Sequence, residues 1–418
     1  MVGTGRRAIV IGGGVIGSTS AYFLSQDGWD VTIVDSGRFA GGCSHGNCGI
    51  VSPSHVLPLT EPGALLRAAK AMIQPNSPFR IRPRFDLALW KWLWHFARRC
   101  NYRDMIEAGH ARHALLTSSR RLYDQLIADE RMDCEWQAYG LLYVFQSGRA
   151  WENYKETDRI LRDNFDLGAQ PYTGQELTEL EPALREGLGG GWLYPSDGHL
   201  RPDRLMACWR KVLEQRGVRI VEHCAVQDFA NGSGRCSAVK TATEDLAGDL
   251  FVVATGALTP QWQRHLGCRI PIQPGKGYSM TMPHPSICPR FPLLFSEHKV
   301  MVTPMRSGYR LGSTMEFAGY DTQLDPRRLA LLTAGATPYL KQPCAAPIQE
   351  EWYGWRPMTY DGVPIIDRSP SMENVWIAAG HNMLGLSMSP ATGKLIAELI
   401  GGREPHVDPH PYRVSRFG

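Results

Sequence analysis

The sequence contains no run of 18 or more apolar residues, which excludes an ordinary membrane-spanning helix. It also contains no long basic tail and no internal repeat. Lysine and arginine total 45 against 41 aspartate and glutamate, and the resulting formal net charge of +4 is too small in 418 residues to indicate binding to nucleic acid. These absences favour a role with a small molecule.

The ten cysteines show no paired short spacings. Cys43 and Cys48 are the closest pair, and no second pair or histidine cluster accompanies them, so neither a disulfide scaffold nor a metal site is expected. Scattered reduced thiols predict a cytoplasmic protein. Arg6 and Arg7 precede an apolar run as in an export signal, but glycines interrupt that run, and cleavage there would remove the motif described next.

The N-terminal segment has the pattern of a strand, a glycine-rich turn, a helix and a second strand. Residues 8–17 run from apolar residues into Gly12-x-Gly14-x-x-Gly17, and a second apolar run ends at Asp35. Gly12 permits a tight turn, Gly14 leaves room for a pyrophosphate, and Gly17 lets helix and sheet approach closely. An acid at the tip of the second strand suits a ribose hydroxyl and repels a 2′-phosphate, so the pattern predicts FAD or NAD rather than NADP.

The rest of the chain alternates between two kinds of pattern, and its length favours two domains. Helical periodicity over residues 86–130 and a strand over 139–145 indicate an inserted domain, whereas 182–201 is loop-rich. The predicted fold is α/β. A Rossmann-type nucleotide-binding domain is assembled from residues 1–53, 201–271 and 350–418, and an α+β substrate domain with an antiparallel sheet comprises residues 54–200 and 272–349.

Two features favour FAD over NAD. The nucleotide domain is interleaved, whereas NAD dehydrogenases usually keep it in one block. Residues 41–53 are also rich in small residues, which suits a loop beside a bulky flat ligand.

With these motifs identified, the sequence resembles the D-amino-acid oxidase superfamily of FAD enzymes, most closely the small-subunit type of bacterial D-amino-acid dehydrogenase. The resemblance depends on the N-terminal turn, residues 44–53, Pro-Gly-Lys-Gly-Tyr-Ser at 274–279, Gly-Trp-Arg-Pro-Met-Thr-Tyr-Asp-Gly-Val-Pro at 354–364, and Ala-Gly-His at 379–381 with Leu-Gly at 384–385. It implies FAD in extended form, with substrate held over the flavin by the antiparallel sheet. Some relatives attach flavin through His or Cys, but His45 is one position out of register with the attaching histidine, so FAD is expected to bind non-covalently. The residues expected to contact FAD are Gly12, Gly14, Val15, Ile16, Gly17, Asp35, Ser36, Ser44, His45, Asn47, Cys48, Gly49, Ile50, Val226, Thr255, Gly256, Arg356, Gly380, His381, Leu384, Gly385 and Leu386.

Arg356 is the main candidate for substrate binding. The resemblance implies that the arginine of the Gly-x-Arg-Pro motif holds the substrate carboxylate, and a planar guanidinium can do so with two parallel hydrogen bonds. The alternative is a structural arginine paired with an acid such as Asp361. Relatives often place a second carboxylate ligand, a tyrosine, on the strand that here runs Val-Met-Val at 300–302; Tyr278 and His298 are the candidates from other positions.

Two further positions carry less definite expectations. His381 is expected to contact substrate or flavin, or to be structural. The family often has glycine where Asp367 stands.

The resemblance implies oxidative deamination of a small amino acid, most simply a D-amino acid. The α-hydrogen would leave as hydride to flavin N5, and the imino acid would hydrolyse to a 2-oxo acid. No side chain is expected to act as acid or base, because the chemistry is centred on the flavin. The alternatives are a secondary amino acid substrate (D-hydroxyproline, sarcosine or iminodiacetate) and a flavin-binding subunit of a larger oxidoreductase without independent activity.

The electron acceptor is left open between a quinone, an electron-transfer partner and O2, and so is a homo- or hetero-oligomer. Residues 90–96, Trp-Lys-Trp-Leu-Trp-His-Phe, have a cluster of arginines around them. This pattern suits a helix lying on the inner face of a membrane as a peripheral contact, but aromatic helices are more often packed in a core, here that of the substrate domain.

Overall fold

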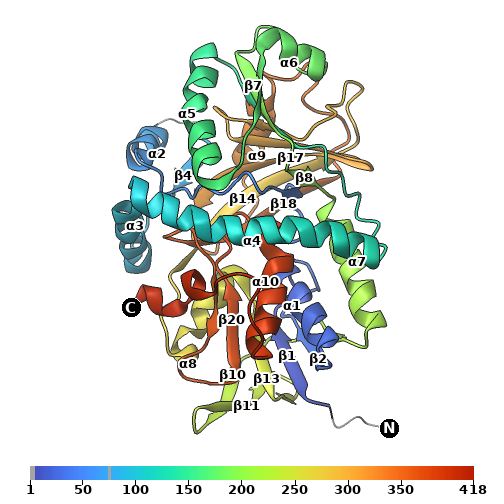
Figure 1. Cartoon of the computed structure of the whole chain (residues 1–418), viewed down its shortest axis with the longest axis vertical. Helices are drawn as coiled ribbons and strands as arrows, with labels where there is room; N and C mark the ends of the chain where they lie inside the picture. The colour runs from blue at the N-terminus through green and yellow to red at the C-terminus, as the bar shows by residue number, and fades with distance from the viewer. Residues whose placement is uncertain (1–4, 74–76) are drawn as a thin grey trace.

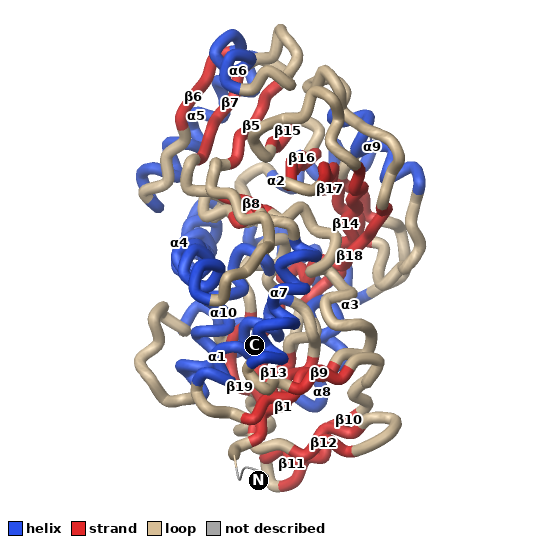
Figure 2. The backbone as a smooth tube through the Cα atoms, turned by 90° about the vertical axis from the view of Figure 1, so that its right-hand side faces the viewer, coloured by secondary structure: helices blue, strands red, loops and turns tan. Residues whose placement is uncertain are grey.

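The computed structural model describes residues 5–73 and 77–418. Two large sheets lie at opposite ends of the molecule, and the long helix α4 (Tyr102–Asp129) crosses between them (Figure 1). A small antiparallel sheet of three strands extends the lower end (Figure 2).

The lower sheet is the predicted nucleotide-binding sheet. Its strand order is β19-β20-β13-β1-β2-β9, and every neighbouring pair is parallel except β19 with β20. The strands are β1 (Arg7–Ile11), β2 (Asp30–Val34), β9 (Arg219–Val221), β13 (Leu250–Val253), β19 (Ile365–Arg368) and β20 (Val375–Ala379). They come from all three predicted segments, which confirms the assembly of this domain from separated pieces of chain.

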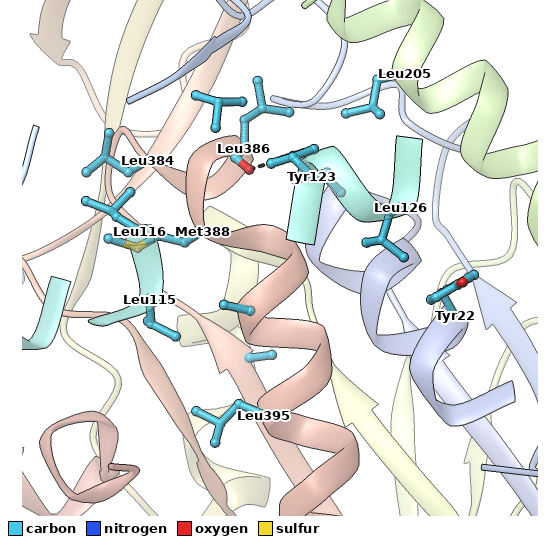
Figure 3. Close-up of a cluster of buried hydrophobic side chains, with 14 of the residues drawn as sticks. Tyr22, Leu115, Leu116, Tyr123, Leu126, Leu205, Leu384, Leu386, Met388 and Leu395 are labelled. Atoms are coloured by element: carbon cyan, nitrogen blue, oxygen red, sulfur yellow. Dashed lines mark hydrogen bonds between the residues drawn. The ribbon is translucent and has the colours of Figure 1, made fainter. Parts of the chain in front are cut away.

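Helices α1 (Val15–Gln26) and α10 (Gly385–Ile400) pack together beside this sheet, with α7 (Pro202–Gln215) against α1. Gly393 permits the close contact, because a Cβ there would lie 2.5 Å from the carbonyl carbon of Thr19. Helix α4 closes the cluster from above, and the Tyr123 hydroxyl donates to the Leu386 carbonyl at 2.8 Å (Figure 3). The start of α10 is therefore fixed by a helix from the predicted substrate domain.

The upper sheet has nine strands in the order β18-β14-β17-β16-β15-β5-β7-β6, with β4 also paired to β17. Most pairs are antiparallel, as predicted. The strands are β4 (Phe79–Ile81), β5 (Leu141–Phe145), β6 (Gln170–Thr173), β7 (Gly190–Tyr194), β14 (Ile272–Met282), β15 (Leu293–Phe295), β16 (Val300–Met305), β17 (Gly308–Phe317) and β18 (Glu350–Thr359). All residues of β14 are buried, between the edge strand β18 and β17.

The remaining elements surround the two sheets. The helices are α2 (Ala64–Ile73), α3 (Leu87–Arg99), α5 (Gly148–Phe165), α6 (Gly174–Leu180), α8 (Gln263–Leu266) and α9 (Pro326–Ala336), with 3-10 turns at Gly256–Trp262, His410–Tyr412 and Val414–Phe417. The small strands are β3 (Ile50–Val51), β8 (Gly198–His199), β10 (Asp228–Gly232), β11 (Arg235–Lys240) and β12 (Asp245–Ala247).

The structure differs from the sequence-based expectation in two places. The predicted boundary at residue 350 lies before β18, yet β18 pairs along its length with β14 and so belongs to the upper sheet. The segment 182–201, predicted to be loop-rich, contains the buried strand β7. Its glycines have a packing reason, because a Cβ on Gly190 would lie 2.8 Å from the ring of Trp151.

Candidate functional site

The glycine turn between β1 and α1 has the geometry that a bound phosphate requires. Gly12 has φ +112°, which favours glycine, and a Cβ on Gly17 would lie 1.9 Å from the Gly12 carbonyl oxygen. Gly14 is the N-cap residue of α1 and has no side chain of its own to cap the helix, and the first turn contains no acid. The positive end of α1 therefore faces a turn built of glycines, as in anion-binding helix termini.

Asp35 follows β2 at the same edge of the sheet. Its carboxylate accepts from the amides of Gly13 at 2.7 Å and Gly37 at 2.8 Å, so it holds the two adjacent turns in place. Each carboxylate oxygen has a second lone pair, which leaves an acceptor for a ribose hydroxyl. The predicted residue Ser36 lies between Asp35 and Gly37 in this turn.

Other predicted FAD contacts come together at this edge. Thr255 and Gly256 follow β13, and Gly380 follows β20; these strands run parallel to β1, so their carboxyl ends lie side by side. Gly256 and Gly380 have positive φ angles of +56° and +79°. Leu384, Gly385 and Leu386 form the start of α10, Val15 and Ile16 open α1, and Val226 lies in the segment after β9, next to β2.

The loop at residues 41–50 connects this edge to the upper sheet. Ser44 Oγ accepts from the Val15 amide at 2.9 Å, and the Asn47 side chain spans its own loop, accepting from the Gly49 amide at 2.9 Å. Gly49 is close-packed, since a Cβ there would lie 2.0 Å from the Leu200 carbonyl oxygen. The His45 ring is 2.7 Å from Glu350 and is partly exposed.

One face of the upper sheet touches this loop. Ser279 on β14 donates to the Gly46 carbonyl and Thr303 on β16 to the Cys48 carbonyl, both at 2.7 Å. Arg310 on β17 donates to the Asn47 carbonyl at 2.6 Å. We call this the inner face of the sheet.

Arg356 lies on the same inner face. On β18 it pairs with Gly275 of β14, and directly opposed residues of an antiparallel pair point to one side, as Gly275, Gly277 and Ser279 do. Its Nη1 donates to the Thr314 carbonyl at 2.7 Å, and burial lowers the pKa of its guanidinium. Among residues 5–73 and 77–418, no carboxylate pairs with Arg356.

The alternative partner for Arg356, Asp361, has another role. Its carboxylate accepts from Arg416 Nε at 2.7 Å. Asp367, where relatives often have glycine, also anchors the C-terminal segment, because its carboxylate accepts from the Val414 amide at 2.8 Å. Arg356 is therefore left with most of its donors unused.

The three other substrate-binding candidates point elsewhere. Tyr278 is on the opposite face of β14 from Ser279, and its hydroxyl donates to the buried Glu316 at 3.1 Å. His298 contacts the Tyr339 hydroxyl at 3.0 Å beside α9. His381 is buried with its ring 3.0 Å from the Thr392 hydroxyl of α10, and burial lowers its pKa to about 3. Each of these three side chains thus has a polar partner within the protein.

Arg310 is a site residue that the sequence did not reveal. It is almost completely buried, and besides Asn47 it donates from Nε to Thr281 at 2.9 Å. Its nearest carboxylates, Glu350 and Asp203, are 3.8 and 3.9 Å away. The available signal was a charged residue in the strand-like stretch Tyr-Arg-Leu-Gly at 309–312, where a buried strand would need a polar partner.

The cysteines near Arg356 are thiols. Cys43 Sγ donates to the Trp355 carbonyl at 2.8 Å, and burial raises its pKa to about 12; burial also raises the pKa of Cys48. All ten cysteines of the chain are free.

Comparison with known proteins identifies the family. The pattern of FAD dependent oxidoreductases matches residues 7–399, nearly the whole chain. The chain belongs to this family. This FAD-dependent oxidoreductase is 30% identical over 424 residues to a D-amino acid dehydrogenase of Granulibacter bethesdensis, with 98% of this chain and 99% of that protein covered. It is 32% identical over 425 residues to a D-amino acid dehydrogenase of Azorhizobium caulinodans, with 98% and 100% covered.

Solved structures with the same fold have lower identity. Glycine oxidase from Geobacillus kaustophilus superposes on the oxidoreductase with a TM-score of 0.80 at 21% identity, covering 98% of this chain and 99% of that one. Iminodiacetate oxidase from Chelativorans sp. BNC1 does so with a TM-score of 0.72 at 21% identity, covering 98% and 99%.

The residues of the oxidoreductase fit FAD. The glycine turn at Gly12, Gly14 and Gly17 suits a pyrophosphate, and Asp35 has acceptors for a ribose. Three separated segments meet at one edge of the sheet, as an extended dinucleotide requires. The inner face of the upper sheet, with Arg356, lies across the loop 41–50 from this edge.

Proposed function

We propose that the protein oxidises the C–N bond of a small amino acid, most simply a D-amino acid, with non-covalently bound FAD. The observation that carries the proposal is Arg356, a partly buried guanidinium on the face that meets the predicted FAD loop, for which the described residues supply no carboxylate partner. The curated relatives named D-amino acid dehydrogenase support the substrate class.

Arg356 would bind and orient the substrate carboxylate with two parallel charge-assisted hydrogen bonds. A site shielded from water favours the neutral amine, whose lone pair can then form the C=N bond as the α-hydrogen leaves. FAD, when bound, supplies the acceptor for that hydrogen and its two electrons. The imino acid is released and hydrolyses to a 2-oxo acid. No described side chain beside Arg356 is needed as an acid or a base.

A secondary amino acid is the second candidate substrate. Sarcosine, D-hydroxyproline and iminodiacetate present the same carboxylate next to an oxidisable C–N bond. The similarity to iminodiacetate oxidase and glycine oxidase favours including them in any test.

Substitution of Arg356 tests the proposal. We expect Arg356→Ala to raise KM at least 100-fold while FAD stays bound, because the carboxylate loses a bidentate ligand. Arg356→Lys should be intermediate, and Arg149→Ala, at an exposed arginine outside the site, should match the wild type. The measurement is anaerobic bleaching of the flavin by D- and L-amino acids, sarcosine and iminodiacetate. Admission of air and then of a quinone analogue identifies the acceptor. Unchanged bleaching in Arg356→Ala would contradict the proposal.

We further propose that the helices α2 and α3 contact an anionic lipid surface, which would give access to a quinone. Helix α3 has one face in the core, where Trp92 Nε1 donates to the Met358 carbonyl at 3.0 Å. Its other face exposes Leu87, Trp90 and Trp94, the two tryptophans by 58% and 54%. The aromatic segment 90–96 therefore has one face packed in the core and another face exposed to solvent.

Helix α2 extends this exposed apolar surface. It lies above α3 at the left of Figure 1 and exposes Leu65, Leu66 and Met72. Neither helix contains an acid. Lys70, Lys91 and Arg98 have no carboxylate partner among the described residues, and Arg98 lies 4.8 Å from the centre of the Trp94 ring. Tryptophans among unpaired cations suit the interface of an anionic bilayer. No helix in the described part of the chain is long and apolar enough to span one.

Vesicle sedimentation tests this contact. We expect the protein to sediment with vesicles of phosphatidylcholine and phosphatidylglycerol, much less with phosphatidylcholine alone, and less at high salt. Trp90→Ser with Trp94→Ser should reduce binding at least tenfold, whereas Tyr139→Ser, at an exposed aromatic elsewhere, should not. Equal sedimentation of the double variant, or a dimer that these substitutions dissociate, would contradict the proposal.

A further inference from the structure

We propose that Gly277 and the irregular stretch Ser313–Thr314 form a socket that fixes the orientation of the Arg356 guanidinium. The proposal rests on the function proposed above, in which Arg356 binds the substrate carboxylate. The two glycines of β14, Gly275 and Gly277, both face the inner side of the sheet, but their surroundings differ.

The guanidinium lies flat on Gly277. A Cβ on this residue would be 2.3 Å from Nη1 and 2.4 Å from both Cζ and Nη2 of Arg356. Three nearly equal distances mean that the plane of the group faces the glycine rather than pointing an edge at it. A Cβ on Gly275 would instead meet Met358 Cγ at 2.8 Å, and Arg356 only at its Cβ, at 3.7 Å. Gly277 alone thus makes room for the charged group.

A bulge in β17 stands opposite Gly277. Lys276 pairs with Glu316 and Tyr278 with Ser313. One residue of β14, Gly277, therefore stands opposite two residues of β17, Thr314 and Met315, which is the pattern of a β-bulge. Ser313 and Thr314 have φ angles of +114° and +52°, which L-residues rarely adopt. The next residue is fixed from the other side, because the Met315 amide donates to the Pro78 carbonyl at 2.8 Å and Met315 pairs with Phe79 of β4.

The bulge gives Arg356 its hydrogen-bond partner. The Thr314 carbonyl accepts from Nη1 at 2.7 Å, in the gap that the register shift opens beside Gly277. A guanidinium has five N–H donors, so four remain. With its plane against Gly277 and one corner bound to Thr314, the group can present a fixed edge to a carboxylate. Strained backbone held by its surroundings is a frequent way to orient functional groups.

Substitution of the two glycines distinguishes this socket from ordinary strand packing. The readout is the Kd of FAD-loaded protein for propionate and for its uncharged analogue propionamide, by calorimetry. We expect Gly277→Ala to weaken propionate binding at least 30-fold with propionamide unchanged, and Gly275→Ala to stay within threefold of the wild type. Flavin absorbance verifies that each variant retains FAD.

Thermal unfolding supplies a second measurement that does not depend on ligand. Gly277→Ala should lower the melting temperature when Arg356 is present and not in an Arg356→Ala background, where the clash is absent. If Gly277→Ala does not fold, the double variant should.

Wild-type propionate affinity in Gly277→Ala, or failure of the double variant to fold where Arg356→Ala does, would overturn the socket. Equal wild-type affinity for propionate and propionamide would instead contradict the proposed function itself.

Discussion

Three histidines, His55, His199 and His381, are held neutral by the surrounding protein. Burial lowers the pKa of His55 and His199 to about 4 and that of His381 to about 3. In the unfolded chain a histidine accepts a proton below about pH 6.5. Between that pH and the folded-state pKa, the unfolded state binds more protons than the folded state. The contribution of these histidines to the free energy of unfolding is therefore fully present above pH 6.5 and is lost as the pH decreases towards the folded-state pKa. Asp197 acts in the opposite direction, because burial raises its pKa to about 6 and its protonation below that pH favours the folded state.

We expect His381→Gln to reduce this acid sensitivity. Each such histidine contributes a slope of about 1.4 kcal/mol per pH unit in the free energy of unfolding, so the variant should lose about that much slope between pH 6 and pH 4. Urea unfolding at several pH values measures it. Thr392→Val is the control, since it removes the hydrogen-bond partner of His381 but no titratable group. A variant with the wild-type slope would show that His381 is protonated in the folded protein.

Strand periodicity explains which side chains the sequence could assign. Arg356 was predicted from a sequence motif, so its assignment did not depend on knowing how the strands pair. Tyr278 was predicted without knowledge of register. The pairing of Gly275 with Arg356 and of Tyr278 with Tyr353 puts the two side chains on opposite faces. Which face of the sheet a residue of β14 occupies depends on its pairing with a strand about 75 residues away in the chain, and no local sequence pattern encodes that pairing.

At the scale of elements, α4 joins the two parts of the site. Its Tyr123 hydroxyl donates to the Leu386 carbonyl at 2.8 Å (Figure 3) and also lies 3.0 Å from the Ser389 hydroxyl in the first turns of α10. The segment just before this point, from Gly380 to Leu384, is predicted to contact FAD. The hydrogen bond therefore couples the packing of a long helix to a cofactor loop.

Tyr123→Phe should weaken that coupling. We expect a loss of about 1 kcal/mol in the free energy of unfolding, because the buried Leu386 carbonyl loses one of its two side-chain donors and keeps only Ser389 Oγ. FAD should also dissociate more readily in dilute urea than from the wild type, which flavin fluorescence can follow. Tyr102→Phe, at an exposed tyrosine of the same helix, is the matched control and should change neither quantity. Equal effects in the two variants would contradict this role.

Elements with local signals were predicted well, and elements that depend on packing were not. Helices α7 and α10 and strands β1, β2, β13 and β20 have clear periodicity or apolar runs. Strand β7 has two glycines because Trp151 and Leu177 pack against it, so its sequence resembles a loop. The bulge at Ser313–Thr314 lies where β17, still paired with β14 along one edge, changes partner along its other edge from β16 to β4.

For the whole molecule, the assembly of the nucleotide domain from three segments was predictable because each segment carries its own strand and small-residue turn. The border between the two domains was harder to predict from the sequence. Strand β18 carries Arg356 and continues directly towards β19 of the lower sheet, so one stretch of chain serves both sheets within 19 residues, from Glu350 to Arg368. Arg356, the proposed ligand of the substrate carboxylate, is thereby attached to the same segment that completes the nucleotide-binding sheet.

The strand order of the lower sheet also means that neighbouring strands are translated at very different times. The apolar strand β1 leaves the ribosome first, but one neighbour, β13, follows only after residue 250, and β20 ends at Ala379. At roughly 5–20 residues per second, translation takes about 20 to 75 s to reach that point. During this time the nascent chain has an open strand edge of the kind that aggregates. Its yield in a cell should therefore depend on chaperones that cover this edge until the last strand is made.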